Sequence, residues 1–84
     1  MKKSEIHSRM QAVFRDQFND PSMQIQDGTT SMDIPDWDSL ANIRLFIALE
    51  QEFGCQFDTD EIASLNNVGD IISCILKKLP DLSS

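Results

Sequence analysis

The chain has 84 residues, of which 40% are hydrophobic, and its 14 acidic and seven basic side chains give a formal net charge of −7 at neutral pH. This length fits one domain, and the hydrophobic content excludes a chain that is disordered throughout. The excess of acids excludes nucleic acids and anionic membrane surfaces as partners, and it favours partner proteins with basic patches.

The acids are concentrated in the middle of the chain. Between Asp16 and Asp70 there are twelve acids and one base, Arg44. A surface that is merely soluble usually mixes both signs, so this distribution favours an acidic docking face.

The sequence shows neither a signal peptide nor a membrane-spanning run, since the longest apolar run covers only residues 45–49. We therefore expect a cytoplasmic protein that does not insert into a membrane. Cys55 and Cys74 lack CxxC spacing, and only one histidine, His7, could join them. We expect neither a disulfide nor a metal site.

Residues 4–18 predict the first helix, because apolar residues at positions 6, 10, 13, 14 and 18 form a helical stripe. Ser4 is its candidate N-cap. Residues 19–38 follow no period and predict a long loop, which inside a domain is usually functional. We expect the scattered apolar residues of this loop to lie against the body of the protein: Met23, Ile25, Met32, Ile34 and Trp37.

Residues 39–53 predict the second helix, which Gly54 ends. Its apolar side chains cover a wide arc, as expected for the central helix of a bundle that packs against several neighbours. A short helix is expected over residues 59–65 and a last one over 68–79, where Pro80 stops it. No strand pattern competes. The sequence therefore predicts a single all-α domain over residues 1–84, a small bundle of three main helices and one short helix.

The segment PDWDSL places Ser39 where the long loop meets the second helix. Capping by Asp38 or Ser39 would contribute about 1 kcal/mol. A hydrolase related to GDSL esterases is a poor fit, because Trp37 replaces the glycine and neither a sheet nor a nearby histidine supports a nucleophile. The carboxylates at 33–38 and 58–60 lack the spacing of a calcium loop. Covalent attachment fits, since a helix N-terminus offers N–H groups and partial positive charge to a phosphate.

These residues resemble the acyl carrier protein family. The resemblance runs from Asp33 to Leu79 and rests on DSL at 38–40, L-x-x-x-L-E-x-E-F at 45–53 and I-x-x-L-x-x-V-G-D at 62–70. It implies a monomeric, non-catalytic carrier that holds acyl intermediates as thioesters on 4′-phosphopantetheine attached to Ser39. A separate phosphopantetheinyl transferase would move this group from coenzyme A. Asp38 would help to position the serine and the metal of the transferase, and Leu40 would lie beside the arm.

The resemblance also implies how partners and cargo are bound. Docking to enzymes that load or process the acyl group, through their basic patches, is expected at Trp37, Ile43, Arg44 and Glu50. A slot for the acyl chain is expected from Phe46, Leu49, Ile62, Ile71 and Ile75.

Two residues depart from the pattern of the family. Trp37 stands where fatty-acid carriers have a small residue. At this position the chain resembles standalone carriers of specialised-metabolite, glyceryl or envelope pathways. Arg44 stands where the family commonly has glutamate. Fatty acid, polyketide and other specialised pathways stay open, and so does aminoacyl, peptidyl or D-alanyl cargo. An unmodified acidic helical adaptor is the more remote alternative.

Overall fold

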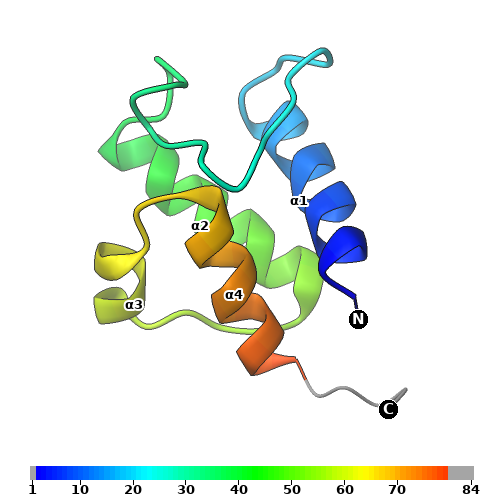
Figure 1. Cartoon of the computed structure of the whole chain (residues 1–84). Coiled ribbons are helices and arrows are strands. Elements are labelled where there is room, and N and C mark those ends of the chain that lie inside the picture. The colour runs from blue at the N-terminus through cyan, green and yellow to red at the C-terminus, as the bar shows by residue number, and fades with distance from the viewer. Residues whose placement is uncertain (1, 80–84) are drawn as a thin grey trace.

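In the computed structural model, which describes residues 2–79, the chain forms four helices joined by loops (Figure 1). They are α1 (Lys3–Gln17), α2 (Ser39–Phe53), α3 (Thr59–Ser64) and α4 (Val68–Lys78). α1 packs on α2 and on α4, and the short α3 lies at the edge of the bundle away from α1 (Figure 1). Residues 2–79 contain no strand, so the predicted all-α bundle of three main helices and one short helix is confirmed.

The helix boundaries lie close to the predicted ones. α2 has the predicted bounds, α1 begins and ends one residue earlier than predicted, and α3 and α4 each end one residue early. The prediction of Ser4 as N-cap is wrong, because the helix begins before it and its N-cap is Lys2, which makes no side-chain cap bond. The predicted stop at Pro80 lies outside the described residues.

The core is formed where the apolar stripes of α1, α2 and α4 meet. Its helical members are Ile6, Met10, Phe14, Leu45, Phe46, Leu49, Phe53, Val68, Ile71, Ile72 and Ile75. Burying a side chain of this size contributes about 1.5–3 kcal/mol, so these stripes are the main source of stability.

The apolar arc of α2 is wider than its buried face. Leu40, Ile43 and Ile47 are 57%, 55% and 50% exposed. The expectation that the whole arc packs against neighbouring helices is therefore wrong for these three residues, because no described segment covers that side of α2.

The C-terminal end of α2 is closed by Gly54 and by Arg9 of α1. Gly54 adopts φ 66°, a left-handed conformation that glycine takes without steric cost. Arg9 Nε bonds to the carboxylate of Glu52 at 2.7 Å, and its Nη2 donates to the Glu52 carbonyl at 2.6 Å. The guanidinium also lies 5.1 Å from the ring centroid of Phe53. A cation is thus held where the dipole of α2 is negative.

The loop after α1 is fastened to that helix by side chains at every fourth position. We call these four residues the α1 ladder: Lys3, His7, Gln11 and Arg15. Lys3 pairs with Asp27 at 2.8 Å, and Arg15 Nε donates to the Met23 carbonyl at 2.6 Å. Between them, His7 Nε2 lies 2.7 Å from the Ile25 carbonyl, and Gln11 Oε1 accepts the Ile25 N–H at 3.0 Å. Residues 23–27 therefore run along α1, which binds the Met23 carbonyl and both backbone groups of Ile25.

The apolar residues of the loop mostly face the bundle, as expected. Ile25, Ile34 and Trp37 are buried and Met23 is partly buried. Met32 contradicts the expectation, because it lies in a turn at 31–33 and is 92% exposed.

The same loop also binds the start of α4. The N–H groups of Val68 and Gly69 donate to the carbonyls of Thr29 and Asp27 at 3.0 and 2.8 Å. A Cβ on Gly69 would lie 3.0 Å from the Asp27 carbonyl oxygen, so glycine permits this close approach. The first N–H groups of a helix have no partner within it, and the loop supplies partners for two of them.

α3 has no buried residue and is tied to α4 through Glu61. Glu61 Oε1 accepts the backbone N–H of Asp58 at 2.9 Å and pairs with Lys78 Nζ at 2.8 Å. The Cys74 thiol donates to Oε2 at 3.5 Å. One carboxylate therefore caps its own helix and joins it to the next.

Candidate functional site at the start of α2

Ser39 is the first residue of α2, and Asp38 caps the helix in front of it. Asp38 Oδ1 accepts the N–H of Ala41, and its carbonyl accepts the N–H of Asn42, both at 2.8 Å. The Ser39 hydroxyl is left exposed and bonds to no residue from 2 to 79. It lies at the positive end of the α2 dipole, where free N–H groups favour a phosphate.

Trp37 is expected on the docking surface, but the structure buries it to 7% exposure. Its ring meets Phe14 edge to face, with centroids 5.3 Å apart and an interplanar angle of 88°. Its Nε1 donates to Asn42 Oδ1 at 2.9 Å. A side chain that fills the space between the loop and α1 cannot contact a partner without leaving the core. The predicted docking role of Trp37 is therefore corrected to a packing role.

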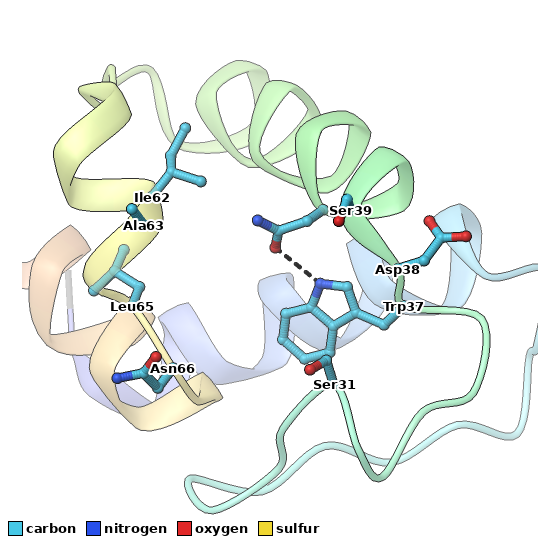
Figure 2. A pocket seen from close by; sticks show the side chains of 9 residues that line it. Ser31, Trp37, Asp38, Ser39, Ile62, Ala63, Leu65 and Asn66 are labelled. Carbon is cyan, nitrogen blue, oxygen red and sulfur yellow. Dashed lines mark hydrogen bonds between the residues drawn. The ribbon is translucent and has the colours of Figure 1, made fainter.

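A groove of about 380 Å³ opens beside Ser39, between the start of α2 and α3 (Figure 2). Its lining residues are Ser31 from the loop, Trp37, Asp38, Ser39 and Asn42 at the start of α2, and Ile62, Ala63, Leu65 and Asn66 in and after α3. Clefts that bind small ligands commonly enclose about 300–1,000 Å³. The groove is thus large enough to receive a flexible chain attached at Ser39.

The expected docking residues differ in how free their side chains are. Ile43 and Arg44 are exposed on α2, close behind the exposed Leu40. Arg44 lines a second hollow of about 260 Å³ together with Asp36 and Asp38. Glu50 is half-buried, and its Oε2 accepts the N–H of Phe57 at 2.8 Å. Its carboxylate holds the segment that follows α2, so Ile43 and Arg44 are the expected docking residues with free side chains.

Four of the five residues expected to line an acyl slot meet in the core. Phe46, Leu49, Ile71 and Ile75 are at most 1% exposed. Ile62 is partly buried, because α3 lies at the edge of the bundle. Ile62 contacts the core and also lines the groove beside Ser39. In this structure the slot is closed, and a cargo chain would have to displace packed side chains.

The described residues give Ser39 no catalytic partner. His7 lies on α1, where it is bonded to the loop, and no group of three or more His, Cys, Asp or Glu in residues 2–79 could hold a metal ion. Cys55 and Cys74 are free thiols, and burial raises the pKa of each above its ordinary value. Within the described part of the chain, no helix combines the length and apolarity needed to cross a membrane.

Sequence reasoning missed the polar residues of the groove. Asn42 follows Ser39 by three positions, which places both on one face of α2, and this spacing was a usable signal. Ser31 and Asn66 come from loops before and after the site. Nothing in their local sequence indicates that they lie near Ser39.

The surroundings of Ser39 suit a carrier better than an enzyme. A nucleophilic serine needs a base within hydrogen-bond reach, and the Ser39 hydroxyl has no partner among the described residues. A serine that other enzymes modify needs accessibility, which Ser39 has. These surroundings suit the class of proteins that carry a group attached to a side chain.

Comparisons with known proteins agree with this class. The chain is 32% identical over 80 residues to the acyl carrier protein of Thermosynechococcus vestitus, covering 94% of this chain and 98% of that protein. It is 31% identical over 75 residues to the acyl carrier protein of Lactobacillus acidophilus, covering 89% and 94%. A solved structure of holo acyl carrier protein from Geobacter metallireducens matches with a TM-score of 0.80 and 34% identity, over 84% of this chain and 82% of that one. No protein-family model matches the chain.

The chain belongs to the acyl carrier protein family. Members of this family are carriers and not enzymes, and they bear a covalently attached 4′-phosphopantetheine. They work with phosphopantetheinyl transferases and with acyl-processing enzymes. The resemblance found in the sequence is thereby confirmed at the level of the family.

Proposed function

We propose that Ser39 bears 4′-phosphopantetheine and that the chain carries acyl groups on it for a biosynthetic pathway. The observation that supports this most directly is the exposed, unbonded Ser39 hydroxyl at the first position of α2, beside a groove. When attached, the group supplies a thiol that holds the acyl chain as a thioester. The chain's own residues supply the attachment point and its surroundings.

The residues next to Ser39 fit this group. The free N–H groups at the start of α2 suit its phosphate. Asp38 uses Oδ1 to cap the helix, while its Oδ2 bonds to no described residue and remains available to the metal of a transferase. Leu40 offers an exposed apolar side chain beside the attachment point.

The negative charge of the molecule supports the proposal that its partner enzymes bind it through basic patches. Twelve acids and one base lie between Asp16 and Asp70, and such a surface steers basic partners toward the carrier. The one base, Arg44, lies on α2 five residues after Ser39. A positive charge so close to the attachment point favours a specialised pathway with its own enzymes, among the fatty acid, polyketide and other pathways that the family allows.

The attachment is tested by incubating the protein with coenzyme A and a broad-specificity phosphopantetheinyl transferase and measuring intact mass. We expect wild type to gain one phosphopantetheine group and Ser39→Ala to gain none. Ser31→Ala is the matched control, since Ser31 is an exposed serine of the same groove, and it should be modified like wild type. An unmodified wild type would favour the helical adaptor, and a modified Ser39→Ala would move the attachment site elsewhere.

A further inference from the structure

The groove beside Ser39 has walls of unlike chemistry. Along α3 and the residue after it, the side chains of Ile62, Ala63 and Leu65 give an apolar wall (Figure 2). The facing side contains the Asn42 amide and the Ser31 hydroxyl. An occupant that fits both walls combines apolar carbons with groups that accept hydrogen bonds.

The orientation of the Asn42 amide is fixed by chemistry. The indole N–H of Trp37 is only a donor, so the Asn42 atom 2.9 Å from it must be the carbonyl oxygen Oδ1. Its Nδ2 then carries two N–H donors, and no bond is recorded from Nδ2 to any described residue. Since no buried side-chain polar atom in the described chain lacks a partner, Nδ2 is accessible from outside.

Trp37 cannot readily turn away from this bond. The residue is 7% exposed, and its ring meets Phe14 edge to face and lies against Phe18, with centroid distances of 5.3 and 6.3 Å. A donor fixed in the core therefore holds the oxygen of Asn42 toward itself and leaves the nitrogen for the groove. Asn42 lies three residues after Ser39, on the same face of α2.

We propose that Trp37 is a positioning residue, which orients Asn42 so that Nδ2 donates to an amide carbonyl of the chain attached at Ser39, within the groove. This inference rests on the proposed attachment. Phosphopantetheine matches the two walls, because it combines amide carbonyls with a branched apolar carbon that can lie against Ile62 and Leu65. The hydrogen bond between Trp37 and Asn42 is already formed in the unmodified protein.

The test uses the holo protein, labelled with ¹⁵N and ¹³C, after its loading has been verified by intact mass. In wild type we expect nuclear Overhauser effects from the arm to the Asn42 side-chain amide and to the Ile62 methyl groups. Two variants remove different parts of the Trp37–Asn42 arrangement. Trp37→Phe keeps an aromatic ring beside Phe14 but loses the donor, and Asn42→Asp keeps the oxygen for Trp37 but loses Nδ2. One neutral hydrogen bond changes a population by about two- to tenfold, so the effects between the arm and the Ile62 methyl groups should weaken by that factor in both variants. The effect to the Asn42 side-chain amide should weaken likewise in Trp37→Phe, whereas Asn42→Asp has no such amide to observe.

Gln51→Ala is the matched control, because it removes an exposed amide of α2 that bonds to no described residue. It should leave the effects between the arm and Ile62 unchanged. A loaded wild type without these effects, or variants with effects as strong as those of wild type, would overturn the inference and leave the attachment intact. A wild type that cannot be loaded would overturn the attachment itself, and the inference with it.

Discussion

At the scale of single residues, Glu61 shows how one carboxylate can hold a helix that has no buried side chain. The backbone N–H of Asp58 and the ammonium of Lys78 both bond to it, and they lower the pKa of Glu61 from 4.5 to about 2. The same contact raises the pKa of Lys78. The ionised form of Glu61 is thus favoured by folding, and protonation must weaken the attachment of α3.

This shift predicts an acid-dependent loss of stability. A group whose pKa is lower in the folded than in the unfolded protein stabilises the fold above its ordinary pKa, and the contribution disappears as the pH falls from about 4.5 toward 2. We compare wild type with Glu61→Gln by urea unfolding at pH 6, 4, 3 and 2. Wild type should be more stable at pH 6, and the difference should shrink to near zero at pH 2.

Asp60→Asn is the control for that experiment, because Asp60 is an exposed acid of the same helix that bonds to no described residue. The difference in stability between Asp60→Asn and wild type should stay small at all four pH values. A constant difference between wild type and Glu61→Gln over this pH range would contradict the role assigned to the Glu61 carboxylate.

At the scale of elements, the α1 ladder gives the loop its conformation. The loop has no regular structure, so its backbone groups need partners from elsewhere. Gln11 accepts a hydrogen bond from the backbone N–H of Ile25, and Ile25 is only 2% exposed. Leaving a buried donor without a partner costs about 1–3 kcal/mol.

We therefore predict that Gln11→Ala destabilises the protein by about 1–3 kcal/mol. Hydrogen exchange of the Ile25 amide should also become faster than in wild type. Gln17→Ala, which truncates an exposed glutamine of the same helix, should change stability by no more than about 0.5 kcal/mol. Unchanged exchange at Ile25 in Gln11→Ala would show that the ladder does not hold the loop.

The exposed face of α2 includes the positive charge of Arg44. The Arg44 side chain is exposed and bonds to no described residue, so its charge contributes little to folding. Close charge pairs at interfaces can contribute about 1.5–7 kcal/mol, and a like-charge contact opposes binding. We expect Arg44 to keep the carrier away from enzymes built for an acidic α2.

The measurement is kcat/KM of the holo protein as substrate for a malonyl transferase of a fatty acid synthase. Arg44→Glu should raise this value by at least about tenfold at low salt, equivalent to 1.4 kcal/mol, and the gain should shrink as salt screens the charges. Lys77→Glu makes the same change of charge on the exposed side of α4 and should have little effect. Equal rates for wild type and Arg44→Glu would make Arg44 an ordinary surface residue.

The elements that could be predicted from the sequence are those whose signals are local. The stripe of α2 and the left-handed Gly54 behind it lie within one stretch of chain, and α2 was predicted to the residue. The ladder could not be predicted, because polar side chains of α1 find partners in the loop up to 24 residues away only after the loop has folded. Ser39 was found through its motif. Trp37 was expected both to pack against the body of the protein and to contact partners, because aromatic residues suit both a core and an interface.

At the scale of the whole molecule, the closed core limits how cargo can be accommodated. Phe46, Leu49 and Ile71 are packed at 0–1% exposure, so an acyl chain enters only if the bundle opens around it. A ligand that binds only the folded state stabilises it. A net gain of about 1 kcal/mol would raise the melting temperature of a domain of this size by about 4–8 °C.

We predict that loading a medium-length acyl chain raises the melting temperature above that of the holo protein. Loading an acetyl group, which has no chain to bury, is the control and should leave the melting temperature close to that of the holo form. The amide spectra of α2 and α4 should change only with the longer chain. Identical melting temperatures and spectra for all three forms would show that the cargo stays outside the bundle.

The α1 ladder also bears on the order in which the chain folds. Its bonds join residues 8 to 24 positions apart, whereas the bonds from the loop to α4 run from Thr29 to Val68 and from Asp27 to Gly69. Contacts that are local in sequence form faster than distant ones, since shorter loops close at a lower entropic cost. We expect the loop after α1 to adopt its conformation along α1 early in folding. Its carbonyls would then already be in place when α4 packs against them. The least regular part of the sequence then becomes the template on which the last helix docks.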